Sequence, residues 1–158
     1  MTATDASTLL EFMRKRTLGL LDTIAKLPNP EAALGWRPGP GRAHIAWQLM
    51  HIAATDDKHL GVRMKGGDPA EPKNVERYAG GSTPDETIPS VDEIRRYLTE
   101  RRTAMLAHLA TITDWSAKPN EQTQWVYEEW VRVLAWHEAH HHGQAHLTLN
   151  LYKATIPV

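Results

Sequence analysis

Proline and glycine are unevenly distributed along the 158-residue chain, and this distribution restricts the fold more than any other feature. Both gather in the stretches 28–41 and 66–89, where they end helices or form loops. Elsewhere, apolar residues recur at three- and four-residue spacings, and no stretch shows useful strand-like alternation. The sequence therefore predicts an all-α protein, an antiparallel four-helix bundle forming one domain over 1–158. We expect its helices at about 5–26, 42–64, 90–112 and 124–153.

Two local signals refine this prediction. Ser90 and Glu93 have the spacing of a capping box, in which each residue bonds to the backbone N–H of the other, so the third helix should begin there. The stretch 66–89 exceeds the roughly 12–15 residues of ordinary connections. We expect it to shape the entrance to any site in the bundle.

The composition excludes several classes of protein. The chain has 18 Lys and Arg against 19 Asp and Glu, a net charge of -1, which argues against a nucleic-acid partner. It has no cysteine, so disulfides, thiolate metal ligands and a cysteine nucleophile are impossible. No apolar run is long enough to span a membrane, and the N-terminus does not resemble a signal peptide. We expect a cytoplasmic protein without a membrane partner.

Histidine is abundant, with nine residues, and five of them lie between 137 and 146. On a helical wheel with His137 at zero, the apolar stripe of the last helix extends from about -40° to about +60°. His137 therefore lies at the centre of the stripe. His141 lies inside the stripe at about 40°, and Gln144 lies inside it at about -20°. His142 and His146 fall on the polar side, and His140 lies at the edge.

Two histidines one helical turn apart can direct their ring nitrogens at one ion. A third ligand must come from another helix, and His51, deep in the apolar run of the second helix, is preferred over His44 in its first turn. His59 follows a charged patch and should be exposed, and His108 stands alone. The alternative is a set of core histidines that hydrogen-bond one another without a metal.

Several other polar and aromatic residues are candidates for supporting contacts or substrate binding. Glu138 resembles the general base of zinc proteases, but the wheel places it at about 100°, at the border of the polar face, so we expect it at the surface or supporting the ligands. Asp56 and Asp57 could accept hydrogen bonds from imidazole N–H groups, but we expect them in a solvated turn. The full set of candidates for such roles is Gln144, His44, His140, Glu138 and Trp47.

Two motifs resemble those of the DinB-like family, which includes metal-dependent hydrolase-like proteins and thiol S-transferases. One is the stretch 45–53, Ile-Ala-Trp-Gln-Leu-Met-His-Ile-Ala, preceded by Trp36-Arg37-Pro38. The other is 137–144, His-Glu-Ala-His-His-His-Gly-Gln, in which His142 replaces the usual arginine of the family. The resemblance implies a DinB/YfiT-like up-down-down-up bundle, usually dimeric, with a metal held by His51, His137 and His141.

Three neutral imidazoles would leave a divalent metal with an open position, as in catalytic rather than structural sites. Zinc is the first expectation, and nickel, iron or copper also suit three nitrogens. The reacting group would then be a water on the metal or a substrate thiolate, because the chain has no thiol of its own. We therefore expect a metal-dependent hydrolase or low-molecular-weight-thiol S-transferase acting on a small molecule. The alternative is a non-catalytic metal-binding or stress-related bundle.

Overall fold

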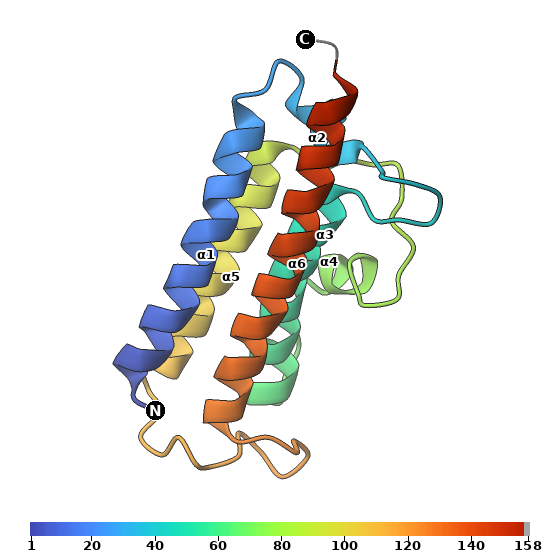
Figure 1. The fold of residues 1–158 in the computed structure, drawn as a ribbon. Helices are drawn as coiled ribbons and strands as arrows, with labels where there is room; N and C mark the ends of the chain where they lie inside the picture. The colour runs from blue at the N-terminus through green and yellow to red at the C-terminus, as the bar shows by residue number, and fades with distance from the viewer. Residues whose placement is uncertain (157–158) are drawn as a thin grey trace.

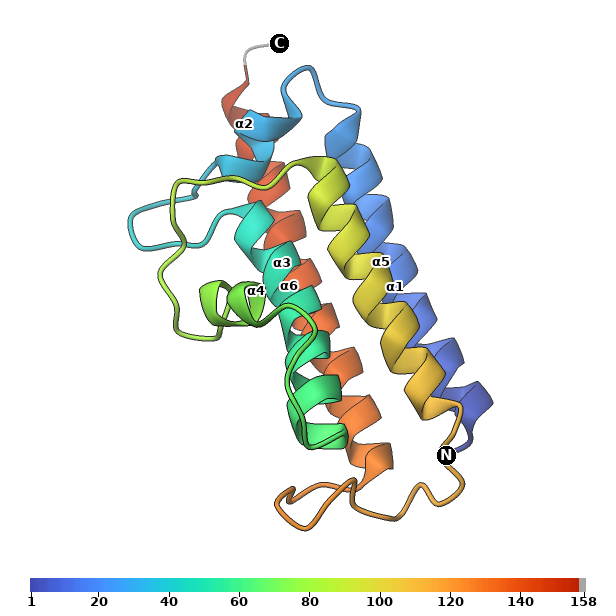
Figure 2. The same cartoon turned by 180° about the vertical axis from the view of Figure 1, so that it is seen from behind.

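The computed structural model describes residues 1–156, and this part of the chain is helical, without strands. Four long helices form the bundle: α1 (Ala3–Ala25), α3 (Ile45–Lys58), α5 (Val91–Leu109) and α6 (Tyr127–Thr155). Figures 1 and 2 show α1 and α6 running in one direction and α3 and α5 in the other, which is an up-down-down-up arrangement. α1 and α3 lie diagonally opposite, and each packs against both α5 and α6. The predicted all-α bundle is confirmed.

The helix starts follow from capping side chains. The predicted cap of α5 is present: the Ser90 Oγ accepts a bond from the Glu93 N–H at 3.2 Å, and the Glu93 carboxylate accepts one from the Ser90 N–H at 2.8 Å. α3 starts three residues later than the Arg42 expected, because His44 is its N-cap. The His44 Nδ1 accepts a bond from the Trp47 N–H at 3.0 Å, and such a cap satisfies a free donor of the first turn.

The second long helix ends in a wider turn, the π-helical segment η1 (His59–Met64). A Cβ atom at Gly61 would lie 2.5 Å from the backbone oxygen of Asp68 and 2.7 Å from the Cα of Pro69. Only glycine allows this approach. The connection 66–89 therefore packs directly against the end of this helix.

Two short helices, α2 (Pro30–Gly35) and α4 (Pro72–Arg77), were not expected from the sequence. Both lie in the proline- and glycine-rich stretches, and both begin with a proline at their first position. Proline is favoured there because its fixed φ angle suits a helix and its missing N–H would have no partner. α4 divides the long 66–89 connection and lies beside α3 (Figure 2).

A layer of four buried charges divides the core. One apolar cluster includes Leu21, Ile52 and Leu98, and the other includes Leu10 and Met105. Each long helix contributes one buried residue of this layer, and that residue lies in sequence between the residues of the two clusters. These residues are Arg14 of α1, Asp56 of α3, Arg102 of α5 and Glu138 of α6. We call them the core ion-pair network.

Each arginine of the network contacts both carboxylates. Arg14 lies 2.8 Å from Glu138 and 2.9 Å from Asp56, and Arg102 lies 2.6 Å from Glu138 and 3.0 Å from Asp56. Arg14 also donates a hydrogen bond to the backbone oxygen of Leu98. All four charged residues are at most 4% exposed. Buried charges of this kind are retained when they are paired.

The expected positions of Glu138, Asp56 and Asp57 are therefore wrong. Glu138 is 1% exposed, because α6 packs against α1 as well as α3 and its buried face is centred near Glu138 rather than His137. Asp57 is also buried, and its carboxylate accepts bonds from the N–H groups of Ala70 and Glu71 at 2.9 and 2.8 Å. Asp57 thus holds the 66–89 connection against α3.

Among residues 1–156, no helix combines the length and the apolar character needed to cross a membrane.

Candidate metal centre

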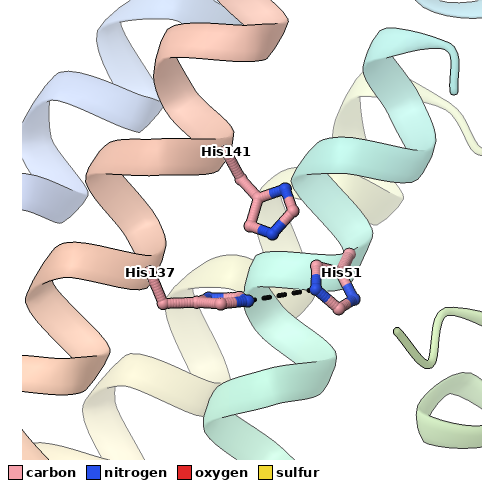
Figure 3. A group of neighbouring side chains, drawn as sticks. All are labelled: His51, His137 and His141. Atoms are coloured by element: carbon pink, nitrogen blue, oxygen red, sulfur yellow. Dashed lines mark hydrogen bonds between the residues drawn. The ribbon is translucent and has the colours of Figure 1, made fainter. Parts of the chain in front are cut away.

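Three histidines from two helices meet at the seam between α3 and α6. His51 lies on α3, and His137 and His141 lie one turn apart on α6. Figure 3 shows the three imidazoles turned toward one another across this seam. One ring nitrogen of each lies within 4.8 Å of the other two, and the Nε2 atoms of His51 and His137 are 3.0 Å apart. The structure thus brings together the three residues that the sequence singled out.

Hydrogen bonds at the Nδ1 atoms of two of these rings fix the orientation of the rings. The Nδ1 of His51 lies 2.6 Å from the backbone oxygen of Tyr78, and the Nδ1 of His141 lies 2.5 Å from the Oε1 of Gln48. Both oxygens only accept hydrogen bonds, so each Nδ1 must carry the proton. The Nε2 of each ring then presents a lone pair.

The surroundings keep the three imidazoles neutral. Burial is the largest cause of the lowered pKa of His51, which is 7% exposed. Burial, followed by the repulsion that a protonated ring would meet from a protonated His51, lowers the pKa of His137 to about 3, and the same two causes lower that of His141 to about 3. Neutral imidazole is the form that binds metal ions, so the site is ready for one at pH 7.

The residues present fit a metal ion. Two lone pairs would repel each other across the 3.0 Å between His51 and His137, so a proton or a cation must lie between the two nitrogens. Nitrogen ligands around a tetrahedral zinc at about 2.0–2.1 Å are roughly 3.3 Å apart, which is close to this spacing. The bonds to Tyr78 and Gln48 match the partners that commonly orient metal-binding histidines.

A comparison with models of protein families assigns the chain to a superfamily. The model of the DinB superfamily matches residues 9–145, most of the chain. The protein belongs to the DinB superfamily. The match includes α3 and α5 in full, most of α1 and α6, and the three histidines. A comparison with curated proteins found no significant match.

In this DinB superfamily protein, three candidates make no hydrogen bond to the histidine cluster within the described residues. His44 binds backbone groups through both nitrogens, the N–H of Trp47 and the oxygen of Asp85 at 3.1 Å. Gln144, expected inside the apolar stripe, is exposed and bonds to His140 at 2.8 Å. The His140 ring stacks on Trp136 and meets the His141 ring edge-on, with centroids 5.0 Å apart.

Trp47 also contacts the cluster. Its ring stacks on His51 with centroids 4.7 Å apart and planes 9° apart. Its indole N–H donates to the Ser82 Oγ at 3.1 Å, which ties the 66–89 connection to α3. Trp47 therefore restricts the orientation of the His51 ring.

Within the described residues, no other histidine joins the three of the cluster in a group that could hold a metal ion. His59 was expected to be exposed and is instead partly buried, with its ring 4.6 Å from that of Trp130. Burial is the largest cause that lowers its pKa to about 4. His108 is partly buried on α5, near Tyr127.

Three residues that contact the histidine cluster were not expected from the sequence. Gln48 and Thr55 flank His51 at helical spacing, and their polar character in an apolar run was a usable signal. The Thr55 Oγ1 lies 3.4 Å from the His137 Nε2. Tyr78 contributes only its backbone oxygen, which any residue could supply, so its identity carries no signal.

Proposed function

We propose that this DinB superfamily protein binds one divalent transition metal through His51, His137 and His141 and acts as a metal-dependent enzyme on a small molecule. The observation that carries the proposal is the convergence of three neutral imidazoles, two of which have their Nε2 lone pair directed to the cluster. Zinc is our first expectation for the metal, ahead of nickel and iron.

The space around the cluster supports catalysis over a purely structural metal. A cavity of about 280 Å³ is lined by His51 and His137, and one of about 650 Å³ is lined by Gln48, the partner of His141. Small-molecule sites have volumes of roughly 300–1,000 Å³, so the first cavity is just below this range and the second lies within it. No fourth His, Asp or Glu joins the three histidines within residues 1–156. A structural site would close its coordination shell with protein ligands.

The reaction class follows from the residues available. A metal at this site supplies a Lewis acid that activates water or a thiol bound to it. The chain has no cysteine, so a thiol must arrive with the substrate. We propose either hydrolysis or the transfer of a low-molecular-weight thiol to an electrophile. Glu138 is committed to Arg14 and Arg102, so neither reaction uses it as a general base.

The experiment is a turnover assay on protein loaded with zinc, nickel or iron, using ester and amide substrates and thiol–electrophile pairs. We expect turnover that requires the metal and disappears in a His51→Ala variant that remains folded. Metal binding without turnover of any pair would favour the alternative, a non-catalytic metal-binding or stress-related bundle.

We also propose that the chain forms a homodimer. Trp136, Leu147 and Leu151 are 65%, 61% and 43% exposed and lie on one face of α6. Such an apolar face is typical of an interface. Analytical ultracentrifugation tests this, with a Leu147→Lys variant expected to be monomeric.

A location in the cytoplasm stays a prediction, and microscopy of a fluorescent fusion would test it.

A further inference from the structure

Two neighbouring cavities extend the seam between α3 and α6 from the histidines toward η1. The first, about 280 Å³, is lined by His51 and His137 and also by Lys58 and His59. The second, about 480 Å³, shares His59 and is also lined by Arg63. We call these two cavities together the η1 groove. It begins at the candidate metal ligands and ends beside Trp125, Trp130 and Val133.

The η1 groove is positively charged against the balance of the whole chain. The chain carries 19 acidic residues, yet neither cavity is lined by an aspartate or a glutamate. Lys58 and Arg63 are exposed, and within residues 1–156 neither forms an ion pair. The nearby carboxylate of Asp57 is turned into the protein, toward the Tyr97 hydroxyl and the N–H groups of the 66–89 connection.

Several other surface arginines have acidic partners, whereas Arg16 and Arg42 are exposed and form no ion pair within residues 1–156. Arg77 pairs with Asp85 at 2.7 Å, and Arg95 pairs with Asp22 at 2.6 Å. Arg96 pairs with both Glu71 and Glu100. Position distinguishes the two cations of the η1 groove from the other unpaired cations: Lys58 lines the cavity that includes His51 and His137, and Arg63 lines the cavity that shares His59 with it. Unpaired cations along a cavity attract anions and raise their local concentration.

His59 joins the two cavities, because its side chain lines both of them. It is partly buried, and burial is the largest cause that lowers its pKa to about 4, so its ring adds no positive charge at pH 7. The charge of the groove therefore comes from Lys58 and Arg63, and it favours an anionic occupant.

We propose that the substrate of the metal site is a small organic anion, whose charged group lies in the η1 groove against Lys58 and Arg63 while its reacting end faces the three histidines. This inference rests on the proposed function, because it assigns the substrate class of the same site. A second copy of the chain is not the occupant, since a symmetric contact would bring the same cations together.

The test uses three thiols of similar length that differ in charge: 2-mercaptoethanesulfonate, 2-mercaptoethanol and thiocholine. The sulfonate and hydroxyl groups are weak metal ligands, and the quaternary ammonium has no lone pair to donate, so the thiol is the coordinating group in each. Binding to cobalt-loaded protein is followed at low salt by the absorption of the thiolate–cobalt contact. We expect the anion to bind about tenfold more tightly than the neutral thiol, and the cation to bind most weakly.

Variants of Lys58 and Arg63 test whether the η1 groove causes the preference for the anionic thiol. In Lys58→Ala/Arg63→Ala, the affinities for the three thiols should agree within about twofold, while the cobalt stoichiometry stays unchanged. In Lys58→Glu/Arg63→Glu, the order should invert. The matched control is Lys15→Ala/Lys153→Ala, which removes two exposed cations from the separate groove between α1 and α6. This control should keep the preference of the wild type.

The outcomes separate the two proposals. If wild-type protein binds no metal, the proposed function fails and this inference fails with it. If metal-loaded protein binds none of the thiols, binds all three equally, or keeps its preference in Lys58→Ala/Arg63→Ala, the inference is overturned and the metal site stands.

Discussion

His137 and Glu138 are neighbours on α6 but belong to two different polar regions of the bundle. His137 is partly buried at the seam with α3, where three neutral histidines lie beside open cavities. Glu138 is 1% exposed and lies in the core ion-pair network, where two arginines contact it. The histidine cluster keeps lone pairs available, whereas the carboxylate of Glu138 already has its partners.

This difference separates a site that can bind a ligand from a layer that stabilises the fold. A buried charge must be matched inside the protein, so the network takes one residue from each long helix and leaves little for a ligand. A neutral imidazole is less costly to bury, so the cluster can stay open to exogenous groups. The predictions below test this separation in order of decreasing effect.

Removing Glu138 should have the largest effect on folding. Glu138→Ala leaves Arg14 and Arg102 buried beside a single carboxylate, and we expect a loss of about 3–5 kcal/mol in the free energy of unfolding, measured in urea. Glu121→Ala is the control, since Glu121 is exposed, and it should change this free energy by less than about 0.5 kcal/mol. A loss below about 1 kcal/mol in Glu138→Ala would contradict the structural role of the network.

Adding metal should stabilise the protein through the histidines alone. At a free metal concentration 100 times the dissociation constant, the free energy of unfolding should rise by about 2.7 kcal/mol. The triple variant His51→Ala/His137→Ala/His141→Ala should show no such rise at the same concentration. An equal rise in the variant would place the metal somewhere else in the protein.

Gln48 should tune the affinity for the metal without changing the number of sites. Its Oε1 orients the His141 ring, so Gln48→Ala should weaken metal binding about 10–100-fold in calorimetric titrations. Gln144→Ala is the matched control, because Gln144 bonds to His140 and not to the cluster. If both variants bind equally well, the bond to Gln48 has no part in positioning His141.

The metal-free protein should lose stability on acidification. The lowered pKa values of His137 and His141, about 3 each, mean that the unfolded chain binds more protons than the folded one as pH falls below about 6.5. We expect the free energy of unfolding to fall by about 1 kcal/mol between pH 6.5 and pH 5. The triple histidine variant should show a shallower decline, and an equal decline would assign the effect to other groups.

The sequence predicted the bundle and the three histidines because both depend on local spacing. Breakers in two stretches define four long helices, and histidines one turn apart share a helix face whatever lies around them. His51 was selected because it lies deep in an apolar run of α3, and the structure turns it toward α6.

The surroundings of the site depend on contacts between distant segments. Glu138 was misplaced because a helical wheel locates one apolar stripe and cannot show that α6 packs against both α1 and α3. The salt bridges of Glu138 join it to Arg14, 124 positions away, and to Arg102, 36 positions away. The backbone oxygen of Tyr78 reaches His51 only because the 66–89 connection packs back on α3.

The most direct test of a metal site at these three histidines is the metal content of protein purified without an affinity tag. The account predicts about one transition-metal ion per chain in the wild type, and none in His51→Ala/His137→Ala/His141→Ala. Wild-type protein that carries no metal, and takes up none from micromolar zinc or nickel, would contradict it and leave a bundle whose histidines only hydrogen-bond one another.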